Sequence, residues 1–307
     1  MEEGLITAKI SVRCIQRFVK DWDFKHGRPP GGKDRKAFEE AYFGAMWQAD
    51  SSYFPYIPDG SGKKRRTFLI LIIDDHSRLI VGAHIYFSDN AENLQATLKS
   101  AVAIYGIPQK FYCDHGSPYI CRQTEFICAD IGTVLLHPMV RDSSAKGKVE
   151  RVFRSIKECW LYGIDQSKIK SIDEFNKMLA IHIREYNLTK HSSTKATPME
   201  RFLATRGRIK QPQSREWLDD KFMHRLTRKV GGDSTVKLDG KQWDAPMQFI
   251  GCTVEVRYTP DGCSDAYIVA DGVRHYLRKT DKVANARTRR ANMPSIDYSQ
   301  MGGADNV

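Results

Sequence analysis

Three carboxylate residues, Asp50, Asp114 and Glu150, occupy positions from which they can converge on one site. Asp50 lies in the middle of a predicted strand, Asp114 directly follows the short apolar run 111–113, and Glu150 lies one turn into a predicted helix. Mg²⁺ prefers oxygen ligands, and a few converging carboxylates leave coordination positions open for water and phosphate. The three residues therefore predict a metal site for phosphodiester chemistry.

The order and spacing of these carboxylates carry this prediction. A lone Asp after a strand is more often a turn or cap residue, and a lone Glu on a helix is usually solvated. Here 63 residues separate Asp50 from Asp114, and 35 residues separate Asp114 from Glu150. With their neighbours, the three residues resemble the D, D-35-E signature of the retroviral-integrase-like (rve) transposases of bacterial insertion sequences. The segments that carry the resemblance are 47–50 (WQAD), 113–117 (CDHGS) and 147–151 (GKVER), within a similar region of about 40–205.

The resemblance implies a reaction and its partners. Asp50, Asp114 and Glu150 would hold two Mg²⁺ ions, for which Mn²⁺ can substitute. One ion would lower the pKa of an attacking water or DNA 3′-hydroxyl, while the other would stabilise the leaving 3′ oxygen. The expected activity is nicking at transposon ends, followed by transfer of the freed 3′ ends to target DNA. Because two ends react together, we expect a homo-oligomer on DNA. An ATPase partner that selects the target, found in some relatives, is left open.

Other carboxylates compete for the metal role. Asp74 and Asp75 begin the sequence Asp-Asp-His-Ser-Arg at 74–78, which is typical of a turn and favours a structural role. Glu158 follows Glu150 by eight residues and is more typical of a solvated helix face.

Basic residues surround Glu150 on its predicted helix. Lys146, Arg154 and Lys157 stand at offsets of −4, +4 and +7, which places them beside the carboxylate on one helix face. We predict that they contact DNA phosphates, although a solvated helix face is the alternative. Lys148 and Arg151 are weaker candidates for the same contact, because they lie off this stripe.

The N-terminal segment predicts a helix over 8–24 that carries Arg13 and Arg17. It resembles the recognition helix of a helix-turn-helix, so both arginines are candidate DNA contacts. Its partner helix is missing from the sequence, so we expect only a partial helix-turn-helix and leave truncation open. A connecting helix explains the segment equally well.

The remaining patterns predict an α/β fold. Strands are expected at 46–56, 66–74, 79–87, 110–113 and 133–136, and helices at 90–105, 122–130, 145–161 and 172–186. This is the element order of an RNase H-like core, a mixed five-stranded sheet with flanking helices. Further short strands, at 228–238, 242–245, 253–258, 266–270 and 275–277, predict a small C-terminal β-barrel. They resemble the barrel of phage Mu-type transposases.

The predicted organisation has six parts. They are a partial helix-turn-helix (1–24), a basic linker (25–45), the catalytic core (46–205), a second linker (206–227), the barrel (228–283) and a basic, then disordered tail (284–307).

Composition is consistent with a nucleic-acid partner. The chain has 307 residues and a formal net charge of +11, which suits a polyanion. Seven cysteines without a C-x-x-C pair argue against a zinc module or a disulfide framework. No apolar run is long enough for a membrane span, and no signal peptide is visible. We therefore expect a cytoplasmic, nucleoid-associated bacterial protein without a membrane partner.

Two other functions stay open. One is a nuclease or resolvase on the same RNase H-like fold, which the 35-residue spacing and the appended barrel disfavour. The other is a DNA-binding relic of a transposase, which would be expected to have lost one of the three carboxylates.

Overall fold

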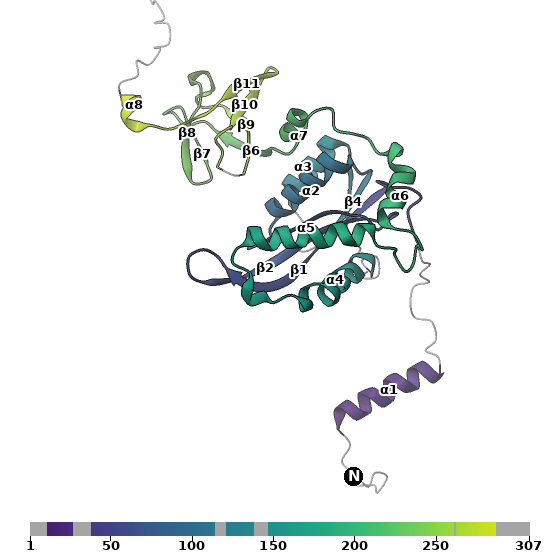
Figure 1. The fold of residues 1–307 in the computed structure, drawn as a ribbon. Helices are drawn as coiled ribbons and strands as arrows, with labels where there is room; N and C mark the ends of the chain where they lie inside the picture. The colour runs from purple at the N-terminus through teal and green to yellow at the C-terminus, as the bar shows by residue number, and fades with distance from the viewer. Residues whose placement is uncertain (1–10, 27–37, 114–120, 138–146, 261, 287–307) are drawn as a thin grey trace, which may run out of the picture. The chain divides into compact units, whose positions relative to one another are not determined.

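The computed structural model describes residues 11–26, 38–113, 121–137, 147–260 and 262–286 (Figure 1). The chain divides into two units, residues 1–39 and 40–307. The first unit contains helix α1 (Val12–His26). This helix begins later than predicted because Ser11 caps it, with its Oγ accepting from the backbone N–H of Cys14 at 3.3 Å. Among the described residues, no helix is both long and apolar enough to cross a membrane.

The second unit is built on a mixed five-stranded sheet in the order β3-β2-β1-β4-β5. Strands β1, β2 and β3 are antiparallel neighbours, whereas β4 runs parallel to both β1 and β5. This arrangement confirms the predicted RNase H-like core. The strand bounds are Met46–Pro58 (β1), Lys64–Asp74 (β2), Ile80–Tyr86 (β3), Lys110–Cys113 (β4) and Val134–Leu136 (β5).

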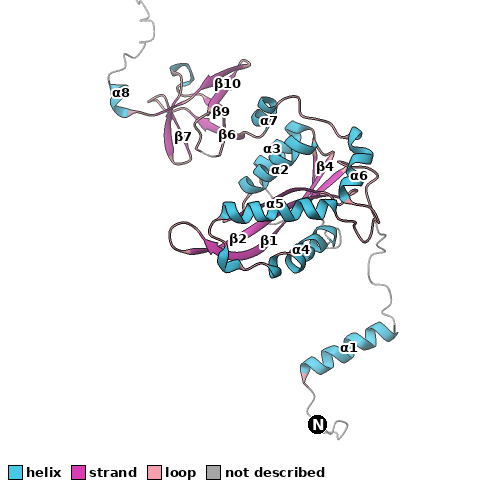
Figure 2. Cartoon of the chain, in the orientation of Figure 1, coloured by secondary structure: helices cyan, strands magenta, loops and turns pink. Residues whose placement is uncertain are grey.

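Helices cover both faces of this sheet, because its central strands are apolar on both sides. On β2, Ile70 and Ile72 pack with residues of helices α2 and α3, whereas Leu69 and Leu71 pack with residues of α4 and α5. Figure 2 shows these helices around the sheet. The helix bounds are Ala91–Tyr105 (α2), Arg122–Ile131 (α3), Gly147–Cys159 (α4) and Ile172–Leu188 (α5). Short 3₁₀ turns follow α4 at Leu161–Gly163 (η2) and Gln166–Lys168 (η3).

The stretch assigned to a linker, 206–227, contains packed structure. It follows helix α6 (Pro198–Thr205) and includes the 3₁₀ turn η4 (Arg206–Arg208) and helix α7 (Arg215–Lys221). Leu218 and Phe222 are buried with the side chains under α2 and α3. The predicted domain boundaries stay predictions, but this stretch contributes to the hydrophobic core.

The C-terminal part is a small barrel-like β domain of two sheets, in the orders β11-β10-β9-β6 and β12-β8-β7. Its core includes Leu238, Trp243, Val256 and Ile268. The strand bounds are His224–Lys229 (β6), Thr235–Leu238 (β7), Lys241–Asp244 (β8), Thr253–Tyr258 (β9), Tyr267–Ala270 (β10), Val273–Tyr276 (β11) and Arg278–Lys279 (β12), with the 3₁₀ turn η5 at Met247–Phe249 and helix α8 at Lys282–Ala286.

The prediction of one strand over 228–238 is wrong, because a turn divides it into β6 and β7. Gly231 donates its N–H to the carbonyl of Thr235, and Ser234 adopts a φ of 62°. The side chain of Asp233 caps this turn by accepting from the N–H of Thr235 at 3.2 Å. The predicted tail beyond residue 286 lies outside the described residues.

Candidate active site

Asp50 and Glu150 line the same open pocket, on β1 and α4 respectively. Asp50 is half-buried, and Glu150 is exposed in the first turn of α4. The pocket measures about 340 Å³ and is open to solvent. It can therefore accommodate hydrated cations and a phosphate group, and its two carboxylates are suitable ligands for a hard cation such as Mg²⁺.

The packing of α4 explains why Glu150 faces the pocket. Val149, Val152, Phe153 and Ile156 form the buried face of the helix, so the side chain of Glu150 lies outside the core. A hydrogen bond joins α4 to β1 at the pocket, since Lys157 Nζ donates to Ser52 Oγ at 2.7 Å. The helix is thereby held against the part of β1 that follows Asp50.

The third predicted ligand, Asp114, lies outside the described residues. Strand β4 ends immediately before it at Cys113, which pairs with Ala49, the neighbour of Asp50. Among the described residues there is no group of three or more His, Cys, Asp or Glu side chains placed to hold a metal ion. The role of Asp114 therefore stays a prediction.

The predicted DNA contacts occupy different places. Arg154 and Lys157 line the pocket with Glu150, whereas Arg151 is exposed beside it. Glu158, which the sequence assigned to a solvated face, is exposed and also lines the pocket. Lys146 lies outside the described residues. Arg13 and Arg17 are exposed on α1, in the other unit.

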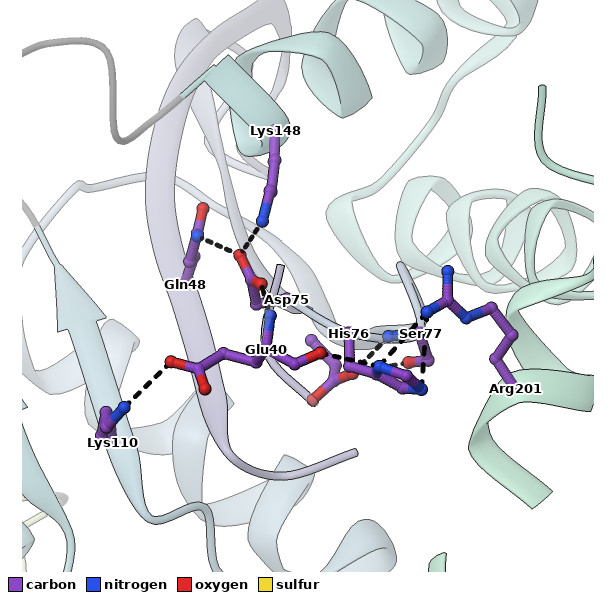
Figure 3. Close-up of polar contacts among 9 residues, drawn as sticks. Glu40, Gln48, Asp75, His76, Ser77, Lys110, Lys148 and Arg201 are labelled. Carbon is purple, nitrogen blue, oxygen red and sulfur yellow. Dashed lines mark hydrogen bonds and ion pairs between the residues drawn. The ribbon is translucent and has the colours of Figure 1, made fainter. Parts of the chain in front are cut away.

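Lys148 differs from the other predicted DNA contacts, because its ammonium group is paired with a buried carboxylate. Its Nζ lies 2.5 Å from Oδ1 of Asp75, which also accepts from Nε2 of Gln48 at 2.8 Å (Figure 3). Oδ2 of Asp75 accepts from the N–H of Glu40 at 2.8 Å. Lys148 is therefore a structural contact of α4 in this structure, which was not predicted.

This buried pair connects the two elements that carry the pocket carboxylates. Gln48 precedes Asp50 by two residues on β1, and Lys148 precedes Glu150 by two residues on α4. Asp75 follows the end of β2 and receives hydrogen bonds from both side chains. The sequence contains no clear local signal for this arrangement, because the three residues come from separate elements.

Asp74 fits the structural role that the sequence favoured. Its carboxylate accepts from the backbone N–H of Gly44 at 2.8 Å and from the N–H and Oγ of Ser77, each at 2.7 Å. Burial raises the pKa of Asp74, and these hydrogen bonds act in the opposite direction. Asp74 therefore holds the turn after β2 to the start of β1 and does not line the pocket.

Comparison with known proteins identifies relatives of this fold. Residues 43–137 match the family model described as "Integrase core domain". The transposase for transposon Tn552 of Staphylococcus aureus is 29% identical over 242 residues, which is 72% of this chain and 50% of that protein. The chain thus spans about half the length of this curated relative.

Solved structures with lower similarity are viral integrases. The HTLV-2 integrase catalytic core domain in complex with magnesium has a TM-score of 0.42 and 16% identity, covering 52% of this chain and 97% of that one. The simian T-cell lymphotropic virus intasome in complex with PP2A regulatory subunit B56 gamma has a TM-score of 0.49 and 14% identity. That match covers 87% of this chain and 98% of the other.

Proposed function

We propose that this chain nicks transposon ends and transfers the freed 3′ ends to target DNA. The match of residues 43–137 to the integrase core domain and the similarity to the Tn552 transposase support this proposal. The observation that supports this activity is the pocket that Asp50 and Glu150 line together with Arg154 and Lys157. Carboxylates for cations and basic side chains for phosphates are the two components that phosphodiester transfer requires.

The proposed ligands are Asp50 and Glu150 together with Asp114, which is carried over from the family motif. Two Mg²⁺ ions bound there would supply a more acidic nucleophile and a stabilised leaving oxygen. The chain itself contributes geometry: Arg154 and Lys157 orient the phosphate, and the packing of α4 on the sheet holds Glu150 towards β1. Mn²⁺ is expected to substitute for Mg²⁺.

The proposed partners are the transposon ends, the target DNA and further copies of this chain. Two ends must react together, so we propose that the active form is an oligomer assembled on DNA. An ATPase partner and a nucleoid location remain predictions from the resemblance.

Strand transfer of a labelled, pre-nicked oligonucleotide into supercoiled plasmid tests this function. The oligonucleotide carries the transposon end that flanks the gene for this chain, and the reaction contains Mg²⁺ or Mn²⁺. We expect metal-dependent joining that Glu150→Gln abolishes, because this change removes a ligand charge while keeping the size of the side chain. The matched control is Glu185→Gln on the exposed face of α5, which should react like the unmodified protein.

Two outcomes would contradict the proposal. Metal-dependent nicking without joining would indicate a nuclease on the same fold. DNA binding with neither reaction would indicate a relic, or a chain that requires a further end-binding domain.

A further inference from the structure

We propose that the β1–β2 hairpin carries a second DNA-contact surface, on which unpaired bases stack. This surface, called the hairpin surface below, consists of Tyr53, Tyr56, Lys64 and Arg66. The inference relies on the proposed function only for the identity of the ligand as DNA. It differs from the predicted contacts on α4 in its element and in the way it would bind.

Two tyrosines and an arginine form the centre of the hairpin surface. Tyr53 and Tyr56 are 65% and 52% exposed, although both are large rings on a strand of the central sheet. The guanidinium carbon of Arg66 lies 5.1 Å from the ring centroid of Tyr53 and 4.9 Å from that of Tyr56. Arginine and tyrosine planes of this kind are the groups on which nucleic-acid bases stack.

A β-bulge brings the two tyrosines together. Residues three apart on a regular strand point to opposite faces, so Tyr53 and Tyr56 would otherwise be separated by the sheet. The register of β1 with β2 shifts between Phe54 and Tyr56, which places one extra residue, Pro55, on β1. Bulges commonly redirect a side chain next to an active site. Here the result is that both rings contact Arg66.

The charge of the hairpin suits a polyanion. Lys63, Lys64, Arg65 and Arg66 are consecutive and exposed, whereas Asp59 is the one acidic residue in the sequence 51–66. The Asp59 carboxylate is turned to its own loop, since it accepts from the N–H and Oγ of Ser61 at 2.9 and 2.7 Å. Lys64 and Arg66 share the face of the exposed rings, so this face combines phosphate attraction with base stacking, as single-strand-binding surfaces do.

The hairpin surface lies farther along β1 than Asp50, towards the end of the strand. Within the described part of the chain, β1 pairs with β4 only from Met46 to Ala49, so this pairing stops immediately before Asp50. At about 3.3 Å per residue, Tyr53 lies roughly 10 Å and Tyr56 roughly 20 Å along β1 from Asp50. This span corresponds to about three to six nucleotides at roughly 3.4 Å each. Because Asp50 and Tyr53 are three residues apart on a regular stretch of β1, the tyrosines lie on the opposite face of the sheet from Asp50. A DNA strand that leaves the pocket reaches them by passing over the edge of β1.

Fluorescence anisotropy with the full chain, in EDTA, tests this surface directly. The probes are a fluorescein-labelled single-stranded oligonucleotide and its duplex. We expect Tyr53→Ser/Tyr56→Ser to weaken single-strand binding about tenfold and duplex binding less than threefold, because only unpaired bases expose their faces for stacking. Tyr53→Phe/Tyr56→Phe should bind as the unmodified protein does. Tyr276→Ser, which removes an equally exposed tyrosine from β11, is the matched control.

The same measurement contains the results that would overturn the inference. Unchanged single-strand affinity in the serine variant, or an equal loss for both DNA forms, would exclude base stacking at this surface. A 2-aminopurine base in the single strand loses fluorescence when it stacks. Loss of this quenching in the serine variant, but not in the phenylalanine variant, would support the inference. Binding is measured in EDTA, where metal-dependent strand transfer does not occur, so failure of the proposed strand transfer and failure of this surface are separable.

Discussion

At the scale of single residues, the pair Lys148–Asp75 is the clearest case of a charge interaction inside the fold. The Asp75 side chain is fully buried, and the Lys148 side chain is 18% exposed. Burying a carboxylate is costly unless hydrogen bonds and an opposite charge compensate it, and Asp75 has both. The pair therefore keeps a charge in the core at the point where α4 meets the sheet.

We expect Lys148→Met to lower the free energy of unfolding by roughly 3 kcal/mol, because it leaves the Asp75 carboxylate buried without its counter-charge. Urea unfolding followed by circular dichroism measures the loss. The double variant Lys148→Met/Asp75→Asn should recover most of it, since both charges are then absent. Lys177→Met, an exposed lysine on α5, should stay within about 0.5 kcal/mol of the unmodified protein. Equal losses in the single and double variants would show that charge pairing is not the cause.

At the scale of elements, a buried histidine joins the barrel-like domain to the core. His224, at the start of β6, has its Nε2 2.6 Å from Oε1 of Gln95 on α2. Gln95 in turn donates from Nε2 to Thr124 Oγ1 on α3 at 2.9 Å. Because the amide oxygen accepts, His224 is the donor and carries its proton on Nε2. Burial lowers the pKa of His224, so the folded protein favours the neutral ring.

This burial predicts a pH dependence with a definite sign. In the unfolded chain His224 gains a proton below about pH 6.5, whereas the folded protein resists the same protonation. The unfolded state then binds more protons, so stability should fall as the pH is lowered below about 6.5. We expect His224→Gln to show a weaker decline than the unmodified protein in urea unfolding between pH 7.5 and 5. His84 and His182, whose pKa values are also lowered by burial, account for the decline that remains. An identical decline in the variant would contradict this assignment.

At the scale of the whole molecule, the net charge of +11 predicts a general affinity for DNA, the proposed partner. Each phosphate contact releases counterions, so the logarithm of affinity falls linearly with the logarithm of salt concentration. The basic residues of α4 and of the hairpin surface lie on different elements, and their contributions should be separable by variants.

Arg154→Gln should reduce the salt slope of duplex binding by about one, because Arg154 lines the pocket and is predicted to contact one phosphate. Anisotropy titrations between 50 and 200 mM salt measure the slope. Lys177→Gln, an equal change of charge on the exposed face of α5, should leave it unchanged. A slope that changes equally in both variants would indicate a response to net charge alone.

The sequence by itself determined the order of the core elements and predicted the residues of the site. The continuous apolar run on β2 and the helical spacing of α4 are local patterns, so strand and helix positions were predictable from them. The spacing of Asp50, Asp114 and Glu150 indicated the resemblance to the transposase and integrase family. That Asp50 and Glu150 line one pocket follows from packing α4 on the sheet, and the structure shows it for these two residues.

Only the tertiary structure decided the contacts between residues distant in sequence. The meeting of Gln48 and Lys148 at Asp75, the bulge that places Tyr53 beside Tyr56, and the burial of Leu218 on α7 leave no clear local pattern. Each depends on how elements pack or pair, and a side chain's partner across such a junction is set by geometry that local periodicity does not contain. The same reason explains why Lys148 was predicted to contact DNA, whereas the folded chain pairs it with a buried carboxylate.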